Sequence, residues 1–195
     1  MNIMNTILYF ILCLALVSCG RGFQEDTAGL RPIHDSAITQ NFSDTALQKD
    51  YYMLGLELMN NEKLGGLFIG LGQEELNCML GEPDIKTEEE LWDGDGAYHH
   101  TLKYTKLGVE IDITGDKESG MAVNMITAES PCSYKLSKGI SIGSSLKEVE
   151  QAYREYINPI FSNSESVLAG SLYGGLIFYF KDDKVNSIFI GATAE

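Results

Sequence analysis

The stretch Leu67-Phe-Ile-Gly-Leu-Gly-Gln-Glu-Glu-Leu-Asn-Cys-Met-Leu-Gly-Glu-Pro83 decides the fold, because its pattern returns later in the chain. The second copy is Ile140-Ser-Ile-Gly-Ser-Ser-Leu-Lys-Glu-Val-Glu-Gln-Ala-Tyr153. In both copies an aliphatic residue and a glycine, Ile69-Gly70 and Ile142-Gly143, lead through small or polar residues into an amphipathic helical pattern. The sequence therefore predicts one structural unit that is used twice.

Each copy contains signals for the two ends of a short helix. In the first copy Gly72 can cap a helix over residues 73–80, which ends at Gly81. In the second copy Ser145-Leu-Lys-Glu148 has the form of a capping box and opens a helix that runs to about Tyr156.

The turns before the two helices are expected to pack alike. We expect Ile69 and Ile142 to insert beneath the helix that follows each of them. The residues Leu71 and Ser144 are expected to face away from the core.

Strand patterns follow each helix, with runs of β-branched and aromatic residues separated by turn signals. The expected strands are 98–104, 107–113 and 121–128 in the first unit, and 175–180 and 185–190 in the second. The predicted fold class is α+β, with two tandem repeats that each pack a helix on an antiparallel β-meander and that can join into one continuous sheet.

Residues 44–58 carry two conflicting patterns. One set of apolar residues falls at helical spacing, namely Leu47, Tyr51, Leu54 and Leu58. Another set alternates as in a strand, namely Tyr52, Leu54, Leu56 and Leu58. Alignment of the two repeats favours a strand over residues 51–58 after a helical turn at 44–49, and it leaves the helix as the alternative.

The first eighteen residues form a segment that is distinct from the rest of the chain. They contain no charged side chain, and their apolar run is too short to span a bilayer but has the length of a signal-peptide core. The run ends at Leu16-Val17-Ser18-Cys19, which resembles the lipobox of bacterial lipoproteins. This resemblance implies cleavage before Cys19 and attachment there of acyl chains such as palmitate. The alternative is an ordinary signal peptide that leaves Cys19 as a free thiol.

The chain therefore divides into four segments. These are a lipoprotein signal peptide at 1–18, a tether at 19–42, repeat 1 at 43–130 and repeat 2 at 131–195.

The charge balance argues against nucleic acid as a partner. The chain of 195 residues has 14 basic and 28 acidic residues and a formal net charge of −14. Such a chain is expected to repel a phosphate backbone.

The order of motifs over about residues 65–191 resembles that of a known group of proteins. An Ile-Gly turn, a helix, Gly-x-Pro and a meander closing on Val-x-x-Ile are similar to the SmpA/OmlA group of small outer-membrane lipoproteins and to the tandem-repeat β-lactamase inhibitor protein. This resemblance implies helices on one face of an antiparallel sheet and a place at the outer membrane, in contact with the periplasm.

Cys78 and Cys132 are the cysteines that remain outside the signal segment and the lipobox. In an oxidising compartment a disulfide between them would tie the first helix to the connection between repeats. The alternative is two separate buried thiols.

The acidic segment before the first strand is followed by two histidines. Asp93, Asp95, His99 and His100 could suggest a metal site. Adjacent residues on a strand point to opposite faces, so the two histidines are not expected to share one ion. We therefore predict neither a metal nor a cofactor. The alternative is a hydrolase or metal-dependent enzyme that uses the segment from Asp93 to His100.

The sequence contains no nucleophile motif, P-loop or zinc-protease motif, so a non-catalytic role is predicted. The expected function is that of a lipid-anchored binding or assembly module of the bacterial envelope, with the membrane and an unidentified envelope protein as partners. The aromatic residues expected to contact that protein are Trp92, Tyr98, Tyr104, Tyr173 and Tyr179.

Overall fold

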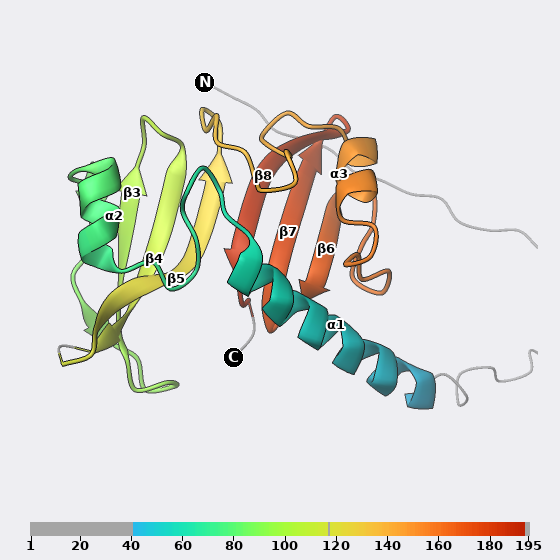
Figure 1. Cartoon of the computed structure of the whole chain (residues 1–195), viewed down its shortest axis with the longest axis horizontal. Coiled ribbons are helices and arrows are strands. Elements are labelled where there is room, and N and C mark those ends of the chain that lie inside the picture. Colours follow the sequence, from blue (N-terminus) through green and yellow to red (C-terminus); the bar gives the residue numbers. More distant parts are fainter. Residues whose placement is uncertain (1–40, 117, 194–195) are drawn as a thin grey trace, which may run out of the picture. The chain divides into compact units, whose positions relative to one another are not determined.

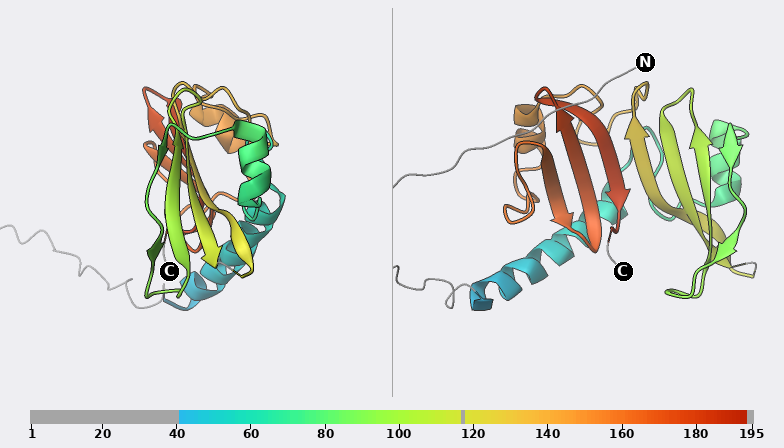
Figure 2. Two further views of the ribbon diagram at one scale, coloured as in Figure 1. Left: turned by 90° about the vertical axis from the view of Figure 1, so that its left-hand side faces the viewer. Right: turned by 180° about the vertical axis from the view of Figure 1, so that it is seen from behind.

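The computed structural model describes residues 41–116 and 118–193. In this part of the chain three helices lie against one face of an antiparallel sheet (Figure 1). The edge-on view in Figure 2 shows these helices together on one side of the sheet. The predicted α+β class is confirmed. The predicted signal peptide, most of the tether and Cys19 lie outside the described residues.

The elements follow the chain in the order shown by the colours of Figure 1. The helices are α1 (Asn41–Asn61), α2 (Gln73–Leu80) and α3 (Leu146–Ala152). The strands are β1 (Ile85–Lys86), β2 (Glu90–Leu91), β3 (Tyr98–Tyr104), β4 (Val109–Asp116), β5 (Gly120–Glu129), β6 (Ser166–Ser171), β7 (Gly174–Lys181) and β8 (Lys184–Gly191).

One sheet contains all of these strands. Its order is β1-β3-β4-β5-β8-β7-β6, and β2 also pairs with β3. The two halves join where β5 pairs with β8, from Ile126 opposite Ile190 to Glu129 opposite Ser187. The predicted continuous sheet is therefore present.

The two faces of the sheet have different surroundings. In β7 Leu176 and Phe178 are fully buried on the side that the helices cover, whereas Tyr179 is 44 % exposed. In β3 Leu102 is buried, and Lys103 next to it is partly exposed. We call the side that the described helices leave uncovered, which carries Lys103 and Tyr179, the open face.

Residues 51–58 belong to α1, so the predicted strand is wrong. This helix packs on β6 and β7, where a Cβ atom at Gly55 would overlap the carbonyl oxygen of Gly174. Leu58 is buried in the core, but Tyr52 is 41 % exposed. Apolar side chains thus occur on both sides of α1, and they produced the apparent alternation.

The two short helices begin after glycine turns of the same geometry. Gly70 and Gly143 have φ angles of 88° and 87°, a region that favours glycine. The N–H of Gly70 donates to the carbonyl of Val123, and the N–H of Gly143 donates to that of Val185, both at 2.8 Å. Each turn is thereby bonded to the last strand of its own half.

The predicted capping box of α3 is confirmed. The Ser145 hydroxyl accepts from the N–H of Glu148 at 3.3 Å, and the Glu148 carboxylate accepts from the N–H of Ser145 at 2.7 Å. The helix ends before the predicted Tyr156, because the chain turns so that the N–H of Asn158 donates to the carbonyl of Leu168 in β6.

The side chains around the glycine turns differ from the prediction. Leu71 is 1 % exposed, so the expectation that it faces away is wrong. Its carbonyl accepts from the N–H of Val123 in β5 at 2.9 Å, and its side chain joins the core. Ile69 and Ile142 are only partly buried, although both pack against the core.

The predicted disulfide is absent. Cys78 is an exposed free thiol on α2, and Cys132 is a buried free thiol after β5. The buried residue of α2 is Leu76, so Cys78 lies on a part of the helix that does not face the core.

Candidate functional site

A polar cluster is built around His99 on the open face. His99 lies in β3, opposite Glu90 of β2 and Thr114 of β4. Its side chain is only 2 % exposed, although none of the helices in residues 41–193 covers this face. The ring of Trp92 is stacked on it, with 3.9 Å between ring centroids and 11° between the ring planes.

The two ring nitrogens of His99 face two different carboxylates. Nε2 lies 2.9 Å from Oδ2 of Asp95, and Nδ1 lies 3.2 Å from Oδ2 of Asp112. Nε2 also lies 3.1 Å from Oγ1 of Thr114, a hydroxyl that can donate or accept. Carboxylate oxygens only accept, so the imidazolium, with a proton on both nitrogens, is the form that satisfies both carboxylate contacts at once. Burial alone would lower the pKa of His99, but the hydrogen bonds to both carboxylates outweigh it and the pKa is raised.

A β-bulge places a further donor in the cluster. The register between β4 and β5 shifts between Asp112 and Ile113, which leaves Asn124 as the extra residue. The amide of Asn124 donates to Oδ2 of Asp112 at 3.0 Å. Asp112 thus accepts from Asn124 and from His99, as a carboxylate can.

The loop between β2 and β3, residues 92–97, supplies the other carboxylate, and we call it the hairpin loop. The N–H of Trp92 donates to the carbonyl of Ala97 at 2.9 Å. The N–H of Ala97 donates to the Asp95 carboxylate at 3.0 Å. This bond, and next the bond with His99, hold the pKa of Asp95 below its usual value.

His100 has a different environment from its neighbour. Its Nε2 lies 3.1 Å from the side-chain amide nitrogen of Gln73 in α2. That nitrogen can only donate, so Nε2 accepts and the ring proton lies on Nδ1, which has no partner. Burial, and then the charge of Lys86, lower the pKa of His100. The pKa values of the two histidines are therefore shifted in opposite directions, and the two rings contact different elements.

A hollow of about 210 Å³ lies beside the cluster. Its lining includes Thr87, Glu88, Glu90, Trp92 and Asp112. Within residues 41–116 and 118–193 no group of three or more histidine, cysteine, aspartate or glutamate residues is arranged to hold a metal ion. Asp93 of the predicted segment is exposed to solvent.

The aromatic residues predicted to contact a partner fall into two groups. Those that are exposed are Trp92 (38 %), Tyr173 (59 %) and Tyr179 (44 %). Tyr98 is partly buried. Tyr104 is 3 % exposed and packs in the core, with its hydroxyl donating to the carbonyl of Gly81 at 3.4 Å. The prediction is wrong for Tyr104, because alternation in β3 turns its side chain toward the helices.

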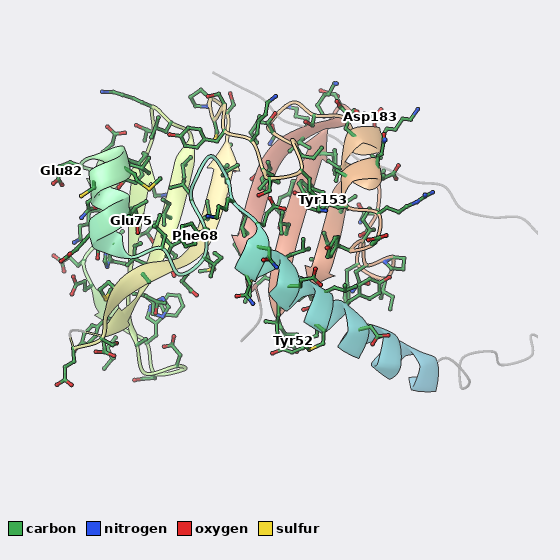
Figure 3. All side chains as sticks on the ribbon, viewed as in Figure 1. Tyr52, Phe68, Glu75, Glu82, Tyr153 and Asp183 are labelled. Atoms are coloured by element: carbon green, nitrogen blue, oxygen red, sulfur yellow. The ribbon has the colours of Figure 1, made fainter. Side chains whose placement is uncertain are left out.

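A second polar group lies inside the core. One of its members is Tyr153, which lies on the side of the sheet that the helices cover (Figure 3). Glu62, just after α1, is 3 % exposed. Its carboxylate accepts from the Tyr153 hydroxyl at 2.8 Å, from the N–H of Ser137 at 2.5 Å and from the N–H of Lys63 at 3.3 Å. Burial, and next the carboxylate of Glu62, raise the pKa of Tyr153.

Sequence reasoning missed two of the residues of the His99 cluster. It singled out Asp95, His99 and Trp92, but not Asp112 or Asn124. Asp112 carries a signal that could have been read, since it is a charged residue in the alternating run of a strand. The bulge that brings Asn124 to it has no such signal.

Comparisons of the chain with protein-family models, with curated proteins and with solved structures find no match. None of the helices in the described part of the chain is long and apolar enough to cross a membrane.

Proposed function

We propose that this chain is a lipid-anchored protein of the bacterial envelope, held at the outer membrane through Cys19, and that it acts as a non-catalytic protein-binding or assembly module. The observation that carries the proposal is the one-sided sheet. The helices of the described chain cover one face, and the strands of both halves present the open face as one surface. A broad sheet surface of this kind suits a protein partner.

The chemistry of the open face supports a protein as the partner. Tyr179 is 44 % exposed there. Met125 and Phe189 are partly buried, and both lie close to the position that a Cβ atom at Gly191 would occupy. An aromatic and thioether surface next to a glycine offers apolar contact, and Tyr and Met are enriched at such interfaces.

We further infer that the chain is a tandem repeat of the SmpA/OmlA-like type. The two glycine turns have the same φ and the same bonds to the last strand of their halves. In chain order α2 precedes β3, β4 and β5, and α3 precedes β6, β7 and β8, so each half places a helix before three strands. In the sheet, β3, β4 and β5 lie in that order up to the β5–β8 pair, and β6, β7 and β8 lie in that order up to the same pair from the other edge. This matching order supports duplication of a single unit.

The lipid anchor has a direct test. Cys19→Ser should abolish labelling with radioactive palmitate and leave the precursor uncleaved by the lipoprotein signal peptidase. A mutant protein that is still labelled and processed normally would rule out Cys19 as the anchor.

The binding role is tested by site-specific photo-crosslinking in intact cells. A photoreactive amino acid at Tyr179 should capture a discrete protein partner. The control position is Met79 on α2, which is equally exposed at 45 % but lies on the helix side. Capture of the same proteins from both positions, or of none from Tyr179, would contradict the proposed use of the open face.

A further inference from the structure

The hairpin loop is fastened to the open face through one ring. Trp92 stacks on His99, and the Asp95 carboxylate accepts from Nε2 of His99. The backbone adds little, because β2 pairs with β3 over only two residues, Glu90 and Leu91. The position of the loop therefore depends on the state of His99.

The contacts of His99 require its proton. A neutral imidazole has one N–H and one lone pair, whereas both nitrogens of this ring face carboxylate oxygens. With the single proton on Nε2, a lone pair would face Asp112. With the proton on Nδ1, the lone pair of Nε2 would face Asp95 and could accept only from the Thr114 hydroxyl, 3.1 Å away. One carboxylate contact therefore becomes repulsive in each neutral tautomer. The stack on Trp92 is also strongest for a cation.

The titratable groups around His99 are mostly acidic, and the Thr114 hydroxyl of β4 is a neutral neighbour 3.1 Å from Nε2. The hairpin loop contributes Asp95, β4 contributes Asp112, and the segment around β2 contributes Glu88 and Glu90. The side chain that faces Asp112 from β5 is the neutral amide of Asn124. Lys103, on the same side of β3, is 2.7 Å from Glu110 and is already paired.

We propose that His99 is a pH-sensitive latch, whose protonated ring holds the hairpin loop on the open face and whose deprotonation releases the loop together with Trp92. The released state exposes the indole ring, and it leaves Asp95 free to move away from Asp112. This inference does not depend on the proposed binding role.

The direction of the switch follows from the two pKa shifts. The pKa of His99 is raised above 6.5, so the latch is fully closed below that value and opens as the pH rises through the raised pKa. The pKa of Asp95 is lowered below 3.8, so its part of the contact is lost only in strong acid. The loop is thus held at mildly acidic pH and released toward alkaline pH.

The single tryptophan of the chain reports on the latch. Trp92 is that tryptophan, so quenching of its fluorescence by acrylamide in the full-length protein in detergent measures release of the loop. Between about pH 5 and about pH 9 the quenching should rise in one transition with its midpoint above the ordinary histidine value. His99→Gln should be readily quenched at every pH and should show no transition.

Two further variants separate the latch from a general effect of pH. His100→Gln, which changes the adjacent neutral histidine, should keep the transition. Asp95→Asn should lower its midpoint by about one pH unit, because it removes one carboxylate from the imidazolium.

Three results would overturn the latch. One is a transition that persists in His99→Gln, and another is quenching that stays constant while NMR shows the His99 ring losing its proton. If His99→Gln fails to fold, an unchanged midpoint in Asp95→Asn serves as the third.

Discussion

The carboxylate of Glu62 depends on donors from separate parts of the chain, and Tyr153 is the one that can be removed by a small change. Tyr153→Phe deletes the hydroxyl that donates to Glu62 at 2.8 Å and leaves the ring in place. Because Glu62 is buried and would lose a hydrogen-bond donor that water cannot easily replace, we expect the free energy of unfolding to fall by about 1–3 kcal/mol in a urea melt.

A matched control lies three residues along the chain. The Tyr156 hydroxyl donates to Glu57 at 3.2 Å, and Glu57 is exposed to solvent, where water can replace the bond. Tyr156→Phe should therefore change the free energy of unfolding by no more than about 0.5 kcal/mol. Equal losses in the two variants would show that burial of Glu62 is not what makes its hydrogen bond important.

At the residue level the sequence predicts which side chains are polar, but it does not predict which of them contact one another in the folded protein. His99 and Asp95 are close in the chain, so their pairing follows from local spacing. Asp112 reaches the same ring only through the pairing of β3 with β4, and Asn124 only through the bulge in β5. Register and bulges depend on tertiary packing, which a single sequence does not display.

Among the elements, α1 is held on the sheet by a close approach of backbone to backbone. A Cβ atom at Gly55 would overlap the carbonyl oxygen of Gly174, which cannot move as the end of a side chain can. Gly55→Ala gains about 1 kcal/mol of helix propensity but should lose about 3 kcal/mol through overpacking. A urea melt should show a net loss of about 2 kcal/mol.

The control for this helix is an alanine substitution on its outer surface. Met53 is 59 % exposed, so Met53→Ala should leave the stability within about 0.5 kcal/mol of the original. A stable Gly55→Ala variant would mean that α1 does not pack on β6 and β7 at this distance.

The starts of the two short helices are capped unequally. Ser145 caps α3 with its hydroxyl, whereas Gly72 caps α2 with no side chain, and a Cβ atom there would meet open space. Ser145→Ala should cost about 1 kcal/mol, and Gly72→Ser should gain a few tenths of a kcal/mol, both read from thermal or urea melts. A loss of stability in Gly72→Ser would show that this turn is not free to accept a cap.

Elements with local signals were predictable, and elements without them were not. The capping box fixes the start of α3, and runs of β-branched and aromatic residues bounded by turn signals identify β3, β4, β7 and β8. By contrast, β1 and β2 have two residues each and form only because the edge of β3 lies beside them. For α1 the apolar residues fit two periods, and only contact with β6 and β7 selects the helix.

On the scale of the whole molecule, the two halves share more than the join between β5 and β8. The helix α1 precedes the strands of the first half but packs on β6 and β7 of the second. Glu62 then bonds the end of this helix to Ser137 in the connection and to Tyr153 after α3. A boundary drawn between two repeats in the sequence therefore cuts through one folded unit, which periodicity alone cannot reveal.

The proposed duplication predicts equal effects at equivalent positions. Ile69 and Ile142 precede the two glycine turns, and both pack against the core while remaining partly exposed. Each change to alanine should therefore cost about 1–2 kcal/mol, less than the 2–5 kcal/mol of a fully buried isoleucine or leucine. Leu71→Ala, at a residue that is 1 % exposed, should fall in that larger range and calibrates the urea melts. If Ile142→Ala unfolds the protein while Ile69→Ala has no effect, the two turns contribute unequally to the free energy of unfolding, and the inferred tandem repeat is contradicted.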